Sequence, residues 1–159
     1  MSRSHDVTAR IAAYGAAALA TLYAAVSLYW TLGGTALLST VGGAVADLAL
    51  RRSPAAVAVG ALTVALKLAG AVIALALVAP PRPGLFERAT AVLAFISSTV
   101  LTLYGLVLVV AGAFVLSGVI KPGGLVDRHA LRWHVFLWDL WFLLWGLSLG
   151  LAVVLRRRR

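Results

Sequence analysis

The sequence predicts an all-α integral membrane protein, built as a four-helix bundle in a single domain. Of its 159 residues, 62% are hydrophobic and only 12% are charged. A soluble domain of this length cannot hide so much apolar surface in one core, so lipid must cover much of it. Four apolar segments also reach about 20 residues, the length that a helix needs to cross a hydrocarbon layer about 30 Å thick.

The four predicted spans are bounded by residues that oppose helix formation or burial in lipid. The second span has the clearest ends, because it lies between Pro54 and the prolines at 80, 81 and 83, where amide donors are missing and φ is restricted. The third span is longer than a bilayer requires, so it must tilt, kink or extend past the membrane. The fourth ends in four consecutive arginines. The predicted spans cover residues 11–30, 55–79, 89–118 and 134–155.

The connecting segments are predicted to be an outer loop at 31–54, a cytoplasmic loop at 80–88 and an outer loop at 119–133. The first of these is apolar, but four glycines and an aspartate interrupt it: Gly33, Gly34, Gly42, Gly43 and Asp47. We therefore expect a loop or a short surface helix there, because irregular backbone is not tolerated against lipid. A re-entrant segment that other helices cover is the alternative.

The distribution of basic residues predicts the orientation. An even number of spans puts both termini on one side, and that side carries eight basic residues against five on the other. Because cytoplasmic loops carry the excess of Lys and Arg, we expect both termini in the cytoplasm and the protein in the cytoplasmic (inner) cell membrane. The first apolar run also fits a signal peptide, but its length and its end at Tyr29 and Trp30 favour an uncleaved anchor.

The composition argues against several classes of function. The formal net charge is +9, yet no basic face carries interleaved aromatic residues outside the apolar spans, so we expect no nucleic-acid partner. The chain has no Cys, which excludes a disulfide framework, a thiol nucleophile and a thiolate metal site. The abundance of Ala, Gly and Arg is typical of a GC-rich bacterial genome.

Lys67 lies near the middle of the second predicted span, where an unpaired cation costs about 2.5 to 3.5 kcal/mol. The residues on its helical stripe are small or polar, and such a stripe packs on other helices rather than on lipid. We therefore expect Lys67 to face the interior of the bundle. The stripe consists of Gly60, Thr63, Lys67, Gly70 and Ala74.

Asp139, in the fourth span, shares a helical face with Gly146 and Gly150 and is also expected to face inward. In the predicted topology Lys67 points toward the depth of Asp139, so the two could pair directly or through a water molecule. Such a pair could merely fix the helix register and neutralise two charges, or it could form a proton or ligand site. The sequence leaves both interpretations open.

Aromatic residues gather in the same part of the fourth span, where His134, Trp138, Trp141 and Trp145 share a stripe at helical spacing. A belt at the membrane interface explains the shallower Trp residues, although Trp145 lies deeper. The alternative is the wall of a pocket for an apolar or cationic ligand, which Tyr23 and Tyr29 of the first span could close. The candidate cavity comprises Asp139, Lys67, Trp138, Trp141, Trp145, His134, Tyr29 and Trp30.

No motif indicates catalysis or a cofactor. The histidines lack the spacing of metal ligands, so we expect no metal site. Ser98, Thr102, Gly105 and Gly112 share one face of the third span, where hydroxyls bond back to their own helix or across to a neighbour. The sequence contains no nucleophile elbow, phosphate-binding loop or dinucleotide fingerprint. We therefore expect no cofactor, and an enzymatic activity is not indicated.

Two segments resemble a small actinobacterial membrane family known as domain-of-unknown-function family 3995. They are YWTLGG at residues 29–34 and WDLWFLLWG at residues 138–146. In that family the second motif more often reads Asp-Pro with a double glycine, whereas this chain has Leu140 after Asp139. The resemblance implies a multi-span membrane protein and supplies no activity.

The sequence thus favours a non-enzymatic binding or accessory membrane protein with a polar-aromatic cavity in the outer leaflet. Its expected partners are the lipid bilayer and, through the small-residue faces, a membrane protein or a second copy of the chain. A small transporter that uses Lys67 and Asp139 is the first alternative. A membrane enzyme acting on a lipid or isoprenoid substrate is the second.

Overall fold

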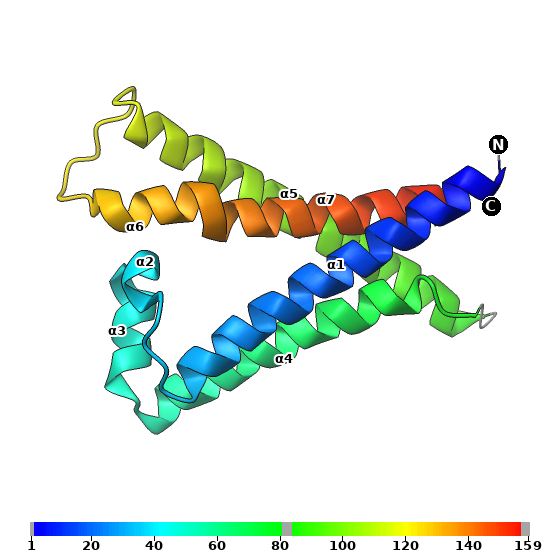
Figure 1. Ribbon diagram of the computed structural model, residues 1–159, viewed down its shortest axis with the longest axis horizontal. Helices are drawn as coiled ribbons and strands as arrows, with labels where there is room; N and C mark the ends of the chain where they lie inside the picture. The colour runs from blue at the N-terminus through cyan, green and yellow to red at the C-terminus, as the bar shows by residue number, and fades with distance from the viewer. Residues whose placement is uncertain (1, 81–83, 157–159) are drawn as a thin grey trace.

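The structure is a computed structural model that describes residues 2–80 and 84–156, and within these ranges every regular element is helical. Four helical segments are long and apolar enough to cross a membrane (Figure 1). They are α1 (Ser2–Thr31), α4 (Pro54–Ala76), α5 (Leu85–Leu116) and a continuous last segment made of α6 (Arg128–Trp133), η1 (His134–Trp138) and α7 (Asp139–Arg156). The predicted all-α bundle is confirmed.

Three of the helices extend beyond the predicted apolar spans into polar sequence. The last segment begins at Arg128 rather than at residue 134, since the Asp127 carboxylate accepts hydrogen bonds from the backbone N–H groups of His129 and Ala130. The helix α1 begins at Ser2 instead of residue 11, and α5 begins at Leu85 instead of residue 89. Apolar content marks the part of a helix that lipid can cover, and not where the helix ends.

The four long segments form two antiparallel pairs. The helix α1 packs on α4, α5 packs on α7, and α1 joins the pairs by packing on α7, whereas α4 and α5 meet over a short stretch only. The pairs cross near the end of the molecule that holds both termini and diverge toward the other end (Figure 1). We call these the terminal end and the distal end.

At the distal end, the segment predicted as a loop or short surface helix forms two short helices, α2 (Leu38–Val41) and α3 (Gly43–Arg51). Leu38 and Thr40 of α2 are buried, whereas every residue of α3 is at least partly exposed. The helix α2 packs on α6, and α3 packs on the start of α4. The two short helices therefore bridge the diverging helix pairs.

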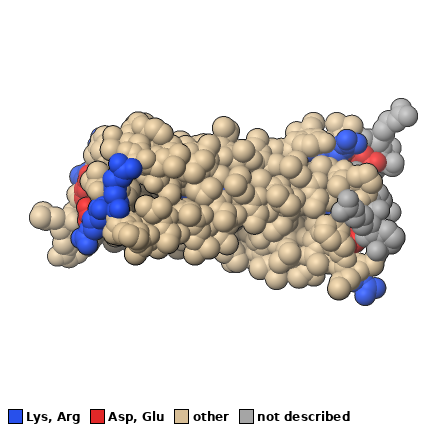
Figure 2. Space-filling model, turned by 90° about the horizontal axis from the view of Figure 1, so that it is seen from below, with Lys and Arg blue, Asp and Glu red and all other residues tan. Residues whose placement is uncertain are grey.

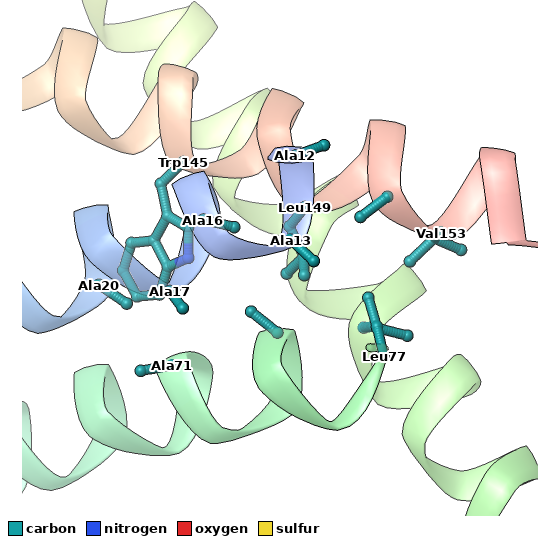
Figure 3. Close-up of a cluster of buried hydrophobic side chains, with 13 residues drawn as sticks. Ala12, Ala13, Ala16, Ala17, Ala20, Ala71, Leu77, Trp145, Leu149 and Val153 are labelled. Atoms are coloured by element: carbon teal, nitrogen blue, oxygen red, sulfur yellow. The ribbon is translucent and has the colours of Figure 1, made fainter. Parts of the chain in front are cut away.

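The space between the helices near the terminal end is filled by a core that is rich in alanine (Figure 3). Ala13, Ala16 and Ala20 of α1 are fully buried, as are Ala74 of α4 and Leu149 of α7. Side chains this small let helix backbones approach closely, which is how helices associate where hydrophobic burial between them is weak. The helices that contribute to this core are consequently closely packed.

Glycines bring α5 and α7 into backbone contact. A Cβ added to Gly105 would lie 2.8 Å from the Leu143 Cα, and one added to Gly146 would lie 2.9 Å from the Leu101 carbonyl carbon. The predicted small-residue faces of the third and fourth spans therefore pack on each other. The Ser98 hydroxyl on the same face donates to the carbonyl of Phe95 in its own helix, at 2.9 Å, as expected for a hydroxyl in an apolar span.

The outer surface has the charge distribution of a membrane protein. On the face shown in Figure 2, charged residues gather at the two ends and a wide band without them lies between. Large apolar side chains along the middle of α5 are exposed, among them Leu93, Ile96, Val100, Leu103 and Val107. The residues at 81–83 and 157–159, which entered the predictions of loops and orientation, lie outside the described residues.

Candidate functional site

A cavity of about 380 Å³ lies between the two helix pairs in the distal half of the bundle. Its volume falls in the range of pockets that hold small molecules, and most of its wall is apolar or aromatic with a few convergent polar groups. Residues of α1, α2, α3, α4, α5, η1 and α7 contribute to it. Its polar and aromatic lining includes Tyr23, Ser27, Trp30, Thr63, Lys67, Tyr104, His134, Trp138 and Asp139.

Lys67 faces this cavity from the middle of α4, so the prediction that it points into the bundle agrees with the structure. Its ammonium group donates a hydrogen bond to the Ser27 hydroxyl of α1 at 2.6 Å. The same nitrogen lies 4.1 Å from the centre of the Tyr23 ring, within the range of a cation–π contact. Lys67 is thus held by a hydroxyl and an aromatic face, both from α1.

Asp139 is paired with a different partner. Its carboxylate lies 3.2 Å from Nδ1 of His134, and its side chain is only 8% exposed. The other ion pair among the described residues joins Arg156 and Glu87. Lys67 and Asp139 line the same cavity but do not form the direct pair that the sequence left open.

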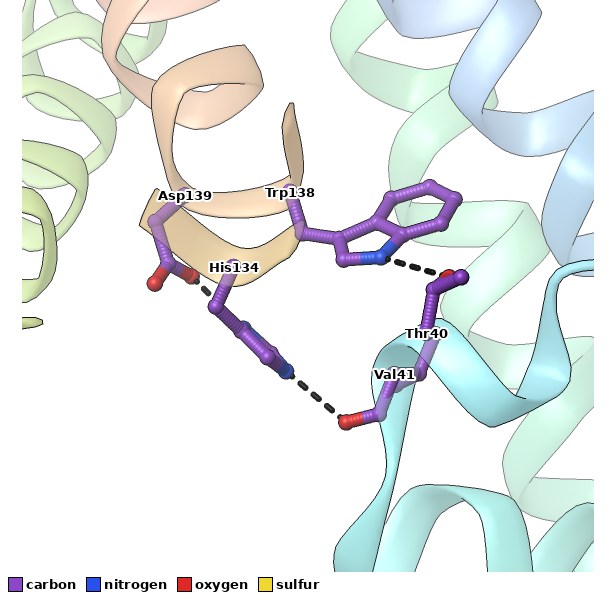
Figure 4. A network of polar contacts seen from close by, with 5 residues as sticks. All are labelled: Thr40, Val41, His134, Trp138 and Asp139. Atoms are coloured by element: carbon purple, nitrogen blue, oxygen red, sulfur yellow. Dashed lines mark hydrogen bonds and ion pairs between the residues drawn. The ribbon is translucent and has the colours of Figure 1, made fainter. Parts of the chain in front are cut away.

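A π-helical turn brings His134 and Asp139 together (Figure 4). In a regular α-helix, residues five apart point about 140° away from each other. Over His134–Trp138 the backbone widens, and the Asp139 N–H donates to the His134 carbonyl, which is the i to i+5 bond of a π-helix. The extra residue in the turn places the two side chains on one face.

Both ring nitrogens of His134 have partners. Its Nε2 lies 2.9 Å from the carbonyl oxygen of Val41 in α2. Its Nδ1 lies 3.2 Å from the Asp139 carboxylate. The imidazole therefore links the buried carboxylate to α2.

Trp30 and Trp138 are buried in the wall of the cavity, at 9% and 2% exposure. Their rings meet edge to face with centroids 5.3 Å apart. Each indole N–H has a partner, since Trp30 donates to the Ala36 carbonyl at 2.8 Å and Trp138 donates to the Thr40 hydroxyl at 3.2 Å. The interface-belt interpretation does not hold for Trp138, because it is enclosed by protein.

Three residues of the predicted candidate cavity do not line it. Trp141 donates to the Leu19 carbonyl of α1 at 3.0 Å and contacts Tyr23, so it joins α7 to α1. Trp145 is buried in the alanine-rich core, where Gly70 leaves room for its ring. Tyr29 is exposed, and its hydroxyl accepts a hydrogen bond from the Ala36 N–H at 3.3 Å. These side chains fasten helices and loops around the cavity rather than facing it.

Some lining residues escaped the sequence analysis. Ser27 is the partner of Lys67, and the only sequence signal for it is a lone hydroxyl in an apolar span. Tyr104 comes from α5, and the Val41 carbonyl comes from a segment whose path the sequence did not define. Contacts of this kind depend on how the helices pair, which periodicity does not report.

Comparisons with known proteins place the chain in a family. Searches of curated proteins and of solved structures gave no match. The sequence profile of one family, described as "Protein of unknown function (DUF3995)", matches residues 20–149, which include the cavity and most of the four long helical segments. The resemblance noted in the two aromatic motifs is thereby confirmed, and this helical membrane protein belongs to the DUF3995 family.

Proposed function

We propose that the protein is a non-enzymatic binding protein of the cytoplasmic membrane, whose cavity takes up a lipophilic molecule from the outer leaflet. The observation that carries this proposal is a mostly apolar cavity that contains Lys67, His134 and Asp139 in the distal half of a lipid-exposed bundle. Ionisable side chains at this depth are costly unless they serve a ligand or fix the structure.

The route for a lipophilic ligand runs between α4 and α5. Val57 and Val59 of α4 and Tyr104 of α5 line the cavity and are also exposed at the molecular surface, by 43%, 47% and 52%. The two helices diverge toward the distal end, and the apolar surface around them would face hydrocarbon. A molecule dissolved in the bilayer can therefore reach the cavity sideways without crossing water.

The other two functions are less well supported. A transporter needs a second route, and Ala13, Ala16, Ala74 and Leu149 in the terminal half have no exposed surface. A second pocket of about 300 Å³ lies at the terminal end between α4 and α5, but no residue lines both pockets. For an enzyme, the sequence contains no catalytic motif, and both ring nitrogens of His134 have partners within the protein. The small-residue faces pack inside the bundle, so the proposal rests on the cavity rather than on contact with a partner.

Quenching of Trp fluorescence by a brominated long-chain alcohol tests the proposal, because Trp30 and Trp138 lie in the cavity wall. The exposed Trp133 is first replaced in a Trp133→Phe background, so that probe dissolved in the surrounding detergent contributes less. We expect saturable quenching by dibromostearyl alcohol.

A matched pair of variants locates the binding site. Thr63→Phe fills the cavity from α4, and Leu66→Phe adds the same ring to the outer side of the same helix, away from the cavity. Saturable quenching should fall in Thr63→Phe and persist in Leu66→Phe. Equal quenching in both variants, or none in the parent protein, would refute the proposal.

A further inference from the structure

The charges that line the cavity do not cancel. The charged or ionisable groups in its wall are Arg52, Lys67, His134 and Asp139, together with the phenols of Tyr23 and Tyr104. Asp139 contacts His134 and not Lys67, so even an ionised Asp139 offsets only one of the positive charges of Lys67 and Arg52. Arg52 adds a second positive charge at the distal end of the cavity, where it donates to the Leu32 carbonyl at 3.0 Å.

Lys67 also has unused hydrogen-bonding capacity. An ammonium group has three N–H donors, and one of them is taken by the Ser27 hydroxyl. The Tyr23 ring contributes electrostatic attraction but no full negative charge. Among the described residues no carboxylate lies within ion-pair distance of Lys67. A cation in an apolar cavity is stabilised most by an anion that brings its own acceptor oxygens.

The position of Lys67 sets the geometry of such a ligand. It is the fourteenth residue of α4, which places its backbone about 20 Å from the distal start of that helix. The lateral opening at Val57 and Val59 lies between these two levels. A ligand whose anionic group contacts Lys67 can thus pass a hydrocarbon chain along the apolar wall and out between α4 and α5.

We infer that the cavity binds an anionic amphiphile, whose carboxylate or phosphate oxygen accepts hydrogen bonds from Lys67 while its chain leaves between α4 and α5. This inference rests on the proposed function and adds the charge of the ligand to it. The inference excludes cationic amphiphiles as ligands. The Trp residues and Tyr23 alone would form a suitable pocket for a cation, but the positive charge of Lys67 would repel it.

The test compares two probes that differ only in their polar group. Dibromostearate and dibromostearyl alcohol are titrated against the Trp133→Phe protein at a pH at which the fatty acid is ionised. We expect the acid to bind at least about tenfold more tightly, as a buried charge-to-charge contact gives. Equal affinities would overturn the inference and leave the proposed function standing, whereas absence of saturable quenching by both probes would overturn the proposed function as well.

Variants and competitors identify the source of the preference. The chain has two lysines, so Lys67→Met removes the charge in the cavity and Lys121→Met removes the same charge from an exposed loop. The preference for the acid should vanish in Lys67→Met and persist in Lys121→Met and Lys67→Arg. The inference would be overturned if folded Lys67→Met still preferred the acid, or if an alkyl ammonium of the same chain length bound more tightly than the acid. It would also be overturned if acetate or inorganic phosphate, at the same concentration, displaced the bound acid. If Lys67→Met does not fold, the ratio of the two probes on the parent protein still decides.

Discussion

Gly146→Ala tests a close backbone contact between α5 and α7. A Cβ at this position would lie 2.5 Å from the backbone nitrogen of Thr102 and 2.9 Å from the carbonyl carbon of Leu101. Because carbon atoms pack at about 3.5 to 4.0 Å and backbone atoms cannot rotate away, α5 and α7 must separate locally by about 1 Å. Overpacking of this size costs about 1 to 3 kcal/mol, partly offset by the gain of up to about 1 kcal/mol from replacing a helical glycine.

The net expectation is a loss of about 1 to 2 kcal/mol in the free energy of unfolding. Gly150→Ala is the matched control on the same face of α7, since its Cβ would meet the Ser98 side chain at an ordinary 3.6 Å. Gly15→Ala is a second control, because nothing lies within 4 Å of its Cβ. Both controls should be neutral or stabilising.

The measurement is equilibrium unfolding in mixed detergent micelles, followed by far-UV circular dichroism and by Trp fluorescence. If Gly146→Ala is as stable as Gly150→Ala, the packing of α5 on α7 is not as described here. A loss of stability in Gly15→Ala would show instead that glycine itself, and not close approach, decides the outcome.

Three further predictions concern the site and the topology. In double-mutant cycles, His134→Ala and Asp139→Asn should show a coupling of about 0.5 to 3 kcal/mol, and Lys67→Met and Asp139→Asn should show a weaker one because they make no direct contact. Trp141→Phe should cost about 1 kcal/mol through the lost hydrogen bond to α1, against less than about 0.5 kcal/mol for the exposed Trp133→Phe. A reporter enzyme that works only outside the cytoplasm should be inactive when fused to the C-terminus, and activity there would invert the predicted orientation.

Much of the fold could be predicted from the sequence because lipid imposes strict requirements. Each span must supply about 20 apolar residues, and the second needed only Pro54 and the prolines after it to mark its limits. Helical periodicity also assigned the inward faces, so that Lys67 and the glycines opposite each other on α5 and α7 lie where they were expected. These properties depend on local sequence alone.

The partners of the buried charges could not be predicted in this way. A regular α-helix puts His134 and Asp139 on different faces, and nothing in the sequence signals the π-helical turn that brings them together. The depths of Lys67 and Asp139 allowed a direct pair, yet Lys67 contacts Ser27 and Asp139 contacts His134 instead. The spacing of residues along the chain indicates which side chains could come into contact. It does not indicate which of the possible contacts has the lowest free energy.

The sequence by itself determined the four apolar helices and their inward faces, since these follow from composition and periodicity, and its match to a family profile gave the family. Only the tertiary structure decided that the helix pairs close at the terminal end and part at the distal end. The physical reason lies in side-chain volume: alanine and glycine let the helices touch along one half, whereas Tyr23, Trp30 and Trp138 hold them apart in the other. That difference creates the cavity around Lys67, His134 and Asp139.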